Sequence, residues 1–246
     1  DPCFLGSLNV LAAGGHAVLP VAVDAHGMQV EALRAALEAG ARAVLLTPRA
    51  HNPTGASLDA KRARALRQLL AGYPQVAVLI DDHYALLSQQ PYHSVLPDDG
   101  RRWALLRSLS KALGPDLRLA WLGCDAATAS VLRLRLAAGT GWVSHLLQDA
   151  ASAVLESAPQ RAKITAAGER YQQRLQSLQE LLRARGLQTP LPMEGLNLWL
   201  PLPGDSHAQV LALAARGWHV RGGEVFAVAA PAHGLRITCA ALGAAE

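Results

Sequence analysis

The chain has 246 residues, of which 51% are hydrophobic and 17% charged, so intrinsic disorder is excluded and a large core can form without disulfides or structural metals. Its formal net charge is +4, but the cations are spread singly along predicted helices, which argues against direct nucleic-acid binding by this stretch. Three scattered cysteines, the lack of a signal peptide and apolar runs far below the roughly 20 residues that span a bilayer predict a cytoplasmic protein without membrane contact.

The first 150 or so residues alternate short apolar runs with helical patterns, which is typical of a parallel β-sheet covered by helices. The expected strands are residues 17–23, 43–46, 76–80, 103–109 and 119–123. One helix is expected around residues 30–37, and a second between a cap at Ser57 and a stop at Gly72. Pro20 would put the first strand at a sheet edge or in a bulge.

From about residue 126 the pattern becomes mainly helical. The expected helices are residues 131–136, 146–155, about 160–185 and 210–215, and the expected strands are residues 196–200, 218–220 and 235–238. We therefore expect two domains. A large α/β domain would cover residues 1–158, and the long connecting helix with a small α+β domain would cover residues 159–246.

Lysine is rare in this chain, where only Lys61, Lys111 and Lys163 stand among 23 cations. Lys61 lies at the polar start of a predicted helix, and Lys163 lies on the solvent side of another. Lys111 directly follows the strand predicted at residues 103–109. Its position indicates a need for an amine, which arginine cannot supply.

Polar residues follow three successive predicted strands. Asn52 lies in the loop after the second strand, Asp81 at the end of the third and Lys111 at the end of the fourth. Because ligands bind at the carboxyl ends of parallel strands, we expect these side chains to converge. An amine that forms an imine, a carboxylate that keeps a ring nitrogen protonated and an amide that donates to a phenolate oxygen meet the requirements of pyridoxal phosphate.

The end of the fourth strand also offers groups that suit a phosphate. Arg118 can make bidentate contacts, and Ser108 and Ser110 supply hydroxyls. The two serines would equally suit a purely structural role at the strand end. Asp81 has an alternative role as a helix cap, for which Asp82 is better placed.

Four motifs in this order resemble the signature of fold-type I aminotransferases. They are Asn-Pro-Thr-Gly at residues 52–55, Asp-Asp-His-Tyr at 81–84, Ser-Leu-Ser-Lys at 108–111 with Arg118 beyond it, and Arg236 near the end. The resemblance covers essentially the whole chain. It implies an α/β fold with a mostly parallel sheet, flanking helices and a small α+β C-terminal domain, and it implies pyridoxal 5'-phosphate as cofactor.

The resemblance also implies a role for each matching residue around the cofactor ring. Lys111 would form the imine with the cofactor, and Asp81 would pair with the pyridine nitrogen. Asn52 and Tyr84 would donate to the ring hydroxyl. Phe4 would stack on the ring, although it would equally suit an ordinary core position.

Further residues would bind the two anionic groups. By the same resemblance, Ser108, Ser110 and Arg118 would hold the phosphate. Arg236 would bind the carboxylate of an amino acid, with a surface ion pair as the alternative. Asn197 has no assigned ligand.

Longer stretches resemble the MocR-type regulators of the GntR superfamily, and among them the PtsJ-like repressors of vitamin B6 salvage. These stretches are residues 47–55, 111–118 and 141–148. In that family a winged-helix DNA-binding head is fused to an aminotransferase-like body that binds pyridoxal phosphate as an effector. The resemblance implies a homodimeric domain that senses the cofactor or a small-molecule amine. DNA would be contacted only through the head, which is absent from this sequence.

Two other functions remain open. The chain would also suit an aminotransferase that acts on an amino acid with a 2-oxo acid acceptor, or a scaffold that only dimerises and binds no cofactor. A winged-helix segment upstream of Asp1 would favour the regulator. No metal site is expected, because His51, His83 and His145 lack the spacing of metal ligands and are expected to be ordinary hydrogen-bonded histidines.

Both domains are expected to be incomplete. The resemblance begins inside the large domain, without the preceding strand and the glycine-containing turn that would help to hold a phosphate. It stops at residues 242–246, where a closing helix should start. We therefore expect this chain to retain the cofactor weakly or not at all.

Overall fold

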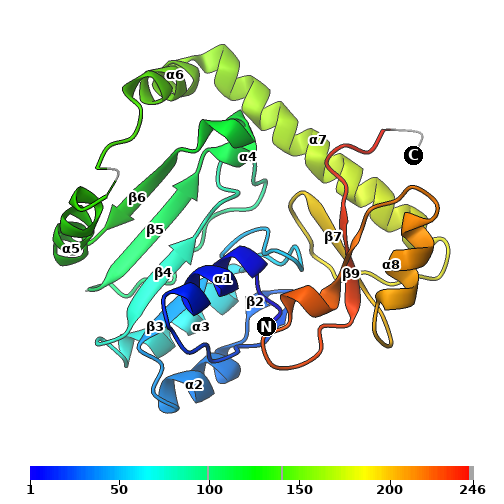
Figure 1. The fold of residues 1–246 in the computed structure, drawn as a ribbon, viewed down its shortest axis with the longest axis horizontal. Helices are drawn as coiled ribbons and strands as arrows, with labels where there is room; N and C mark the ends of the chain where they lie inside the picture. The colour runs from blue at the N-terminus through cyan, green and yellow to red at the C-terminus, as the bar shows by residue number, and fades with distance from the viewer. Residues whose placement is uncertain (99, 140, 244–246) are drawn as a thin grey trace.

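The computed structural model describes residues 1–98, 100–139 and 141–243, so most of the closing helix expected from residues 242–246 lies outside the described part. Figure 1 shows a larger and a smaller sheet, and the long helix α7 (Ala158–Arg183) extends from the side of the larger sheet to the smaller one. The described part contains no helix that is long and apolar enough to cross a membrane.

The larger sheet has the strand order β3-β4-β5-β6. Its strands are β3 (Ala43–Leu46), β4 (Ala77–Asp81), β5 (Trp103–Ser108) and β6 (Ala120–Cys124). The first three are parallel to one another, and β6 is antiparallel to β5. The prediction of a mostly parallel sheet is confirmed, and four of its strands lie within a residue or so of their expected bounds.

Two predicted strands are wrong, and the helices α1 (Leu5–Ala13) and α4 (Ser110–Leu113) were not predicted. Only Val23 of residues 17–23 enters a strand, in the short antiparallel pair β1 (Val23–Asp24) and β2 (Gly27–Met28). The rest of that run is mostly exposed, and Pro20 within it has no N–H to donate to a ladder. Residues 218–220 form no strand either, because β8 (Arg221–Gly222) follows them. The unpredicted α1 (Leu5–Ala13) has no buried face that would give it a helical period.

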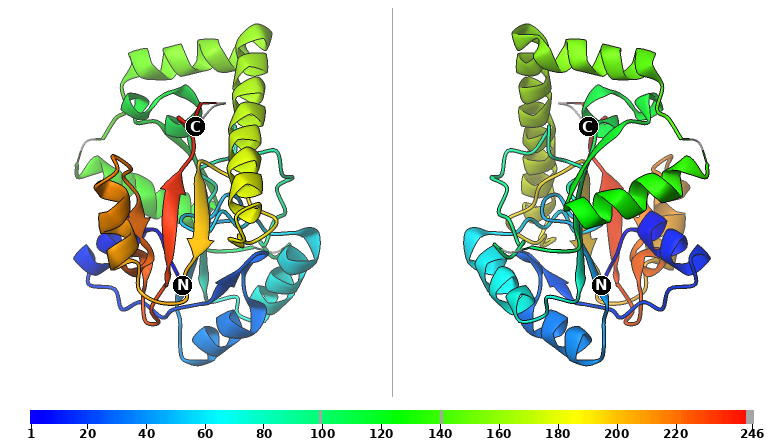
Figure 2. Two further views of the ribbon diagram at one scale, coloured as in Figure 1. Left: turned by 90° about the vertical axis from the view of Figure 1, so that its right-hand side faces the viewer. Right: turned by 90° about the vertical axis from the view of Figure 1, so that its left-hand side faces the viewer.

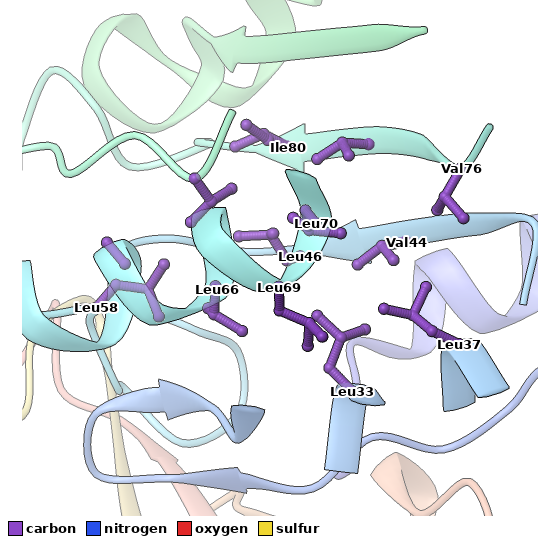
Figure 3. Close-up of a cluster of buried hydrophobic side chains, with 13 residues drawn as sticks. Leu33, Leu37, Val44, Leu46, Leu58, Leu66, Leu69, Leu70, Val76 and Ile80 are labelled. Carbon is purple, nitrogen blue, oxygen red and sulfur yellow. The ribbon is translucent and has the colours of Figure 1, made fainter. Parts of the chain in front are cut away.

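The helices α2 (Val30–Glu38) and α3 (Ala60–Ala71) cover one face of the larger sheet. The helix expected between Ser57 and Gly72 is confirmed as α3, and Ala63, Leu66, Leu69 and Leu70 form its buried face. Figure 3 shows the core that they form with α2 and the strands, in which the labelled side chains are Leu33, Leu37, Val44, Leu46, Leu58, Leu66, Leu69, Leu70, Val76 and Ile80. This core fixes the strand ends from which the predicted site residues emerge.

The cap of α3 differs from the prediction. Asp59, rather than Ser57, accepts a hydrogen bond from the backbone N–H of Arg62 at 2.7 Å. The Ser57 hydroxyl instead accepts from the backbone N–H of Ala50 at 3.0 Å. Ser57 therefore helps to shape the loop that carries Asn52.

Three helices follow the larger sheet, namely α5 (Ala126–Ala137), α6 (His145–Glu156) and α7. The long helix expected at about residues 160–185 is confirmed as α7, and its apolar side chains belong to two cores. Ile164 and Tyr171 pack against the cluster around Tyr84, whereas Leu175 is buried in the core of the smaller sheet. Figure 2 shows α7 beside β7 (Asn197–Pro201). The helix thus joins the two halves of the molecule.

The smaller sheet is antiparallel, with the order β7-β9-β8 and with β9 at Gly234–Thr238. Helix α8 (His207–Ala214) and a short turn of 3₁₀ helix at Gly223–Phe226 accompany it. Its own buried cluster includes Leu198 and Phe226. The domain boundary between residues 158 and 159 stays a prediction.

Candidate functional site

A pocket lies between the loops that follow β3, β4 and β5 and the segment that leads into β7. Its lining includes three of the predicted site residues, Asn52, Tyr84 and Lys111, together with His83 and Asn197. It holds about 330 Å³ of empty space, including space open to solvent. The predicted convergence at the carboxyl ends of the parallel strands therefore occurs for these residues.

Lys111 lies on the short helix α4 (Ser110–Leu113), directly after β5. Its side chain is exposed, and it makes no hydrogen bond or ion pair with any described residue. Its charge nevertheless acts to lower the pKa of Asp81, so the two groups lie within electrostatic reach. The amine is available for chemistry with a ligand in the pocket.

Asp81 is the last residue of β4 and is half-buried. Asp81 is not among the residues that line the pocket, whereas His83 is. Oδ1 of Asp81 lies 3.9 Å from Nδ1 of His83. Burial raises the pKa of Asp81; His83 and Lys111 oppose this rise, and Asp82 adds to it. A cationic partner would therefore favour the ionised form of this carboxylate against the effect of burial.

Arg236 on β9 reaches across from the smaller sheet to the loop that carries Asn52. Its Nη1 donates to Oδ1 of Asn52 at 3.4 Å, and its guanidinium carbon lies 5.3 Å from the centre of the Phe226 ring. Its Nε is buried and has no partner among the described residues. Burial and the neighbouring Arg221 lower the pKa of Arg236. Arg236 thus has a spare donor for an anion such as a carboxylate.

Tyr84 faces both the pocket and a core. It is only 3% exposed and packs with Leu87, Ile164 and Tyr171. Burial raises the pKa of the Tyr84 hydroxyl, so this group stays protonated and acts as a donor.

The predicted phosphate ligands lie near the end of β5, outside the pocket lining. The Ser108 hydroxyl accepts from the backbone N–H of Ser110 at 3.3 Å. Arg118 is exposed, has a left-handed backbone with φ of 42°, and forms no ion pair with a described residue. The structure therefore groups the three residues at one strand end without joining them to the pocket.

Phe4 is 44% exposed, so the alternative of an ordinary core position is wrong. It caps the start of α1, and the backbone N–H of its neighbour Cys3 donates to the carbonyl of Phe226 at 2.8 Å. Burial raises the pKa of the Cys3 thiol, and the Asp81 carboxylate adds to the rise. The segment that carries Phe4 therefore lies close to Asp81.

The three histidines have different surroundings. Nδ1 of His51 shares a hydrogen bond with the Thr54 hydroxyl at 2.8 Å, as expected. Nδ1 of His83 is buried without a partner among the described residues, so the expectation of a satisfied histidine is wrong there. His145 begins α6 and is not among the lining residues.

His51 makes the stability of the fold sensitive to acid. Burial lowers the pKa of His51 to about 3, with smaller contributions from the N-terminal amine and His83. Between the ordinary histidine value of about 6.5 and about 3, the unfolded chain therefore binds a proton that the folded chain does not. As the pH decreases through this window, the free energy of unfolding is expected to decrease by up to about 1.4 kcal/mol per pH unit.

Urea unfolding at a series of pH values tests this expectation. His51→Gln cannot titrate and should flatten the decline, whereas the same change at the exposed His16 should leave it intact. A decline that is equally steep in the His51 variant would contradict the assignment.

The prediction that Asp82 caps a helix is wrong, and so is that alternative for Asp81, because turns follow them at residues 83–87. Asp82 is fully buried. Its carboxylate accepts from Nε and Nη2 of Arg49, at 3.0 and 2.6 Å, and from Nε of Arg107 at 2.9 Å. A single buried carboxylate thus joins the loop after β3 to β5, directly beside Asp81.

Sequence reasoning missed Glu194, which lines the pocket and is 2% exposed. Its carboxylate accepts from the hydroxyl of Ser88 at 2.8 Å and from the backbone N–H of Gln89 at 2.6 Å. The one available signal was a charged residue between Met193 and Gly195, just ahead of a buried strand. That signal does not identify its partners, which lie more than 100 residues away.

The set of donors fits pyridoxal 5'-phosphate. The pocket combines an unpaired amine on Lys111 with an amide on Asn52 and a protonated hydroxyl on Tyr84. Buried ring and guanidinium nitrogens of His83 and Arg236 still lack partners among the described residues. A ring with a hydroxyl, an aldehyde and anionic groups would use these donors.

The family model of class I and II aminotransferases matches residues 2–246. The vitamin B6 salvage pathway transcriptional repressor PtsJ of Salmonella typhimurium is 52% identical over 246 residues, which are 100% of this chain and 57% of the repressor. The chain thus spans little more than half the length of that relative.

Solved structures share the fold. The aromatic aminotransferase of Pyrococcus horikoshii OT3 has a TM-score of 0.88 at 18% identity, over 98% of this chain and 67% of that one. The α-aminoadipate aminotransferase LysN of Thermus thermophilus, complexed with N-(5'-phosphopyridoxyl)-L-leucine, has a TM-score of 0.84 at 20% identity, over 97% and 64% of the two chains. With the family match over nearly every residue, the chain belongs to the class I and II aminotransferase family.

Proposed function

We propose that this chain is the pyridoxal phosphate-binding effector domain of a MocR-type transcriptional regulator that controls vitamin B6 salvage. The observation that carries the proposal is the pocket lined jointly by Asn52, Tyr84 and Lys111. The 52% identity to PtsJ along the whole chain supports the regulatory role over that of an independent enzyme.

When bound, the cofactor supplies an aldehyde for an amine and an electron-accepting ring. Lys111 would hold it covalently through Nζ. Asp81 would pair with the ring nitrogen, and Asn52 and Tyr84 would orient the ring through its hydroxyl. The pyridinium would be a cationic partner that favours the ionised form of Asp81 against the effect of burial.

The remaining predicted residues complete the proposed site. Ser108, Ser110 and Arg118 would hold the phosphate at the end of β5, and Phe4 would cover the ring. Arg236 would bind the carboxylate of an amine effector through its Nε, which has no partner among the described residues.

Sensing would depend on the contact between the smaller sheet and the loop after β3, which Arg236 and Asn52 form. Arg236 on the smaller sheet contacts Asn52 on the larger domain, so a ligand that binds either residue alters this contact. A ligand that favours one arrangement of the sheets shifts the population toward it. In the cytoplasm, such a shift would be transmitted to a separate winged-helix segment that contacts DNA.

A homodimer is part of the proposal. Helix α5 has no buried residue, and large apolar side chains are exposed on and around it, namely Trp121, Leu134, Trp142 and Leu146. Exposed apolar patches of this kind usually mark an interaction surface. A second copy of the regulator would cover this one.

Absorption spectroscopy of the full-length protein with added pyridoxal phosphate tests the proposal. Wild-type protein should develop the band of the lysine-bound cofactor, and borohydride reduction should leave the cofactor's mass on the peptide that contains Lys111. Lys111→Ala should abolish both signals. The matched variant Lys163→Ala, on the exposed side of α7, should keep them.

Two results would overturn the proposal. If Lys111→Ala keeps the band, the site is assigned wrongly. If wild-type protein converts an amino acid and a 2-oxo acid with sustained turnover, it is an aminotransferase rather than a sensor.

A further inference from the structure

His83 is a pocket residue with an unexplained ring nitrogen. Its Nδ1 is buried and has no hydrogen-bond partner among the residues that the structure describes. Oδ1 of Asp81 lies 3.9 Å away, beyond hydrogen-bond distance. Because buried polar groups in proteins are almost always paired, this nitrogen calls for a partner that a small movement or a ligand would provide.

The local chain puts Asp81 and His83 on the same side. Asp81 ends β4 and His83 begins the turn that follows, and their side chains approach to 3.9 Å. Asp82 between them is fully buried, whereas Asp81 and His83 are half-buried. His83 therefore lines the pocket with Asp81 beside it, while Asp82 faces the interior.

Asp82 does not serve as the partner of His83. Both of its oxygens are already occupied, because Oδ1 accepts from Arg49 and Oδ2 accepts from Arg49 and Arg107. Asp81 has no such arginine and forms no hydrogen bond with a described arginine or lysine side chain. Asp81 is thus the available acceptor for Nδ1 of His83.

Charged groups surround the imidazole on several sides. Burial lowers the pKa of His83, and Lys111 acts in the same direction, while Asp81 and Asp82 oppose them. His51 lines the same pocket. A neutral imidazole holds one proton, and a carboxylate beside Nδ1 favours the tautomer with the proton on that atom.

We propose that His83 is a positioning residue for Asp81. Nδ1 of His83 donates to Oδ1 of Asp81, and this hydrogen bond keeps the carboxylate ionised and directed at the ring nitrogen of the bound cofactor. The inference rests on the proposed function. A shift of under about 1 Å brings the 3.9 Å pair within hydrogen-bond range. A hydrogen bond to the ionised form favours it, which offsets the effects of burial and of Asp82 on Asp81.

The pH dependence of cofactor affinity tests this role in the full-length protein. The dissociation constant of pyridoxal phosphate is measured by absorption titration between about pH 5 and 9, a range around the ordinary histidine pKa of about 6.5. Affinity should fall as acid protonates Asp81. In His83→Phe, which has no donor, affinity should be about tenfold weaker at neutral pH. Its acid loss should begin about one pH unit higher, because Asp81 is then easier to protonate.

His83→Asn is the matched rescue, because its amide can donate from about the position of Nδ1. It should restore most of the wild-type profile. Circular dichroism melting shows whether each variant folds. If His83→Phe does not fold, His83→Ala replaces it as the variant without a donor and is compared with His83→Asn.

The outcomes separate the two proposals. Wild-type protein that binds no pyridoxal phosphate overturns the proposed function and this inference with it. This inference alone is overturned if the wild-type protein binds and the variant without a donor has the same pH profile. A uniform fall in affinity does not rescue it, because a merely structural role weakens binding without moving the profile.

Discussion

Asp82→Ala is expected to lower the free energy of unfolding by about 3–5 kcal/mol, the usual cost of removing one partner from a buried ion pair. The carboxylate is 0% exposed and accepts three hydrogen bonds from Arg49 and Arg107. Without it, the partners that the described residues leave to the buried Arg49 are the carbonyl of Gln90, at 3.1 Å, and the ring of Tyr92, 5.5 Å from its guanidinium carbon. A charge left in this state cannot regain its hydration.

Equilibrium unfolding in urea measures this effect. Asp98→Ala is the matched control, because Asp98 is 98% exposed and its contact with Arg67 is 3.7 Å long. The control should change the stability by less than about 0.5 kcal/mol. Asp82→Asn keeps the shape and should lie between the two. A loss below about 1 kcal/mol for Asp82→Ala would show that solvent reaches Arg49 readily.

The sequence predicts those parts of the fold whose signal is local. The stripe on α3 and the strand at residues 43–46 follow from side-chain periodicity, and both are present. The run at residues 17–23 has the composition of a strand but finds no neighbour to pair with over most of its length. The apolar helix α1 has no polar face, so its period is invisible in the sequence.

For the site, too, the sequence predicts the residues with a local signal and misses the contacts between distant residues. Chain order and strand ends predict that Asn52 and Lys111 converge, and both line the pocket. The contact between Asn52 and Arg236 spans 184 residues and has no local signal. The role of Asp82 was misread for the same reason, since its partner Arg49 lies 33 residues earlier. A side chain whose partners are distant is assigned from sequence only by its nearest neighbours, and these suggested a cap.

Glu194→Ala is expected to weaken the contact between the segment that enters β7 and the loops after β3 and β4, and to lower the free energy of unfolding by about 3 kcal/mol, because several partly buried donors lose their acceptor. The residue belongs to the segment that enters β7, yet its carboxylate accepts from Ser88 and Gln89 in the loop after β4, and its own N–H donates to the carbonyl of Gly55 at 2.8 Å. The Ser57 hydroxyl adds a bond at 3.3 Å. A fully buried donor left without its acceptor costs about 1–3 kcal/mol, and these partly buried donors regain part of that cost through water.

The contacts of Glu194 also affect ligand binding, because they hold residues that line the pocket. Gly55 lies in the loop that carries Asn52, and Glu194 lines the same pocket as Asn52. Loosening Glu194 therefore frees the loop that positions Asn52. We expect weaker pyridoxal phosphate binding in Glu194→Ala together with the loss of stability, since a binding-competent arrangement that is less populated lowers the apparent affinity in proportion.

Amide hydrogen exchange locates the effect. In wild-type protein the N–H of Gln89 is held by the Glu194 carboxylate at 2.6 Å and should exchange slowly. It should exchange at least about tenfold faster in Glu194→Ala, while amides in β4 and β5 keep their protection. Glu180→Ala, an exposed glutamate on the same α7 that supports the smaller sheet, should change neither exchange nor affinity. Uniformly faster exchange across both sheets would mean that Glu194 supports the whole fold, and not the contact between the segment that enters β7 and the loops after β3 and β4.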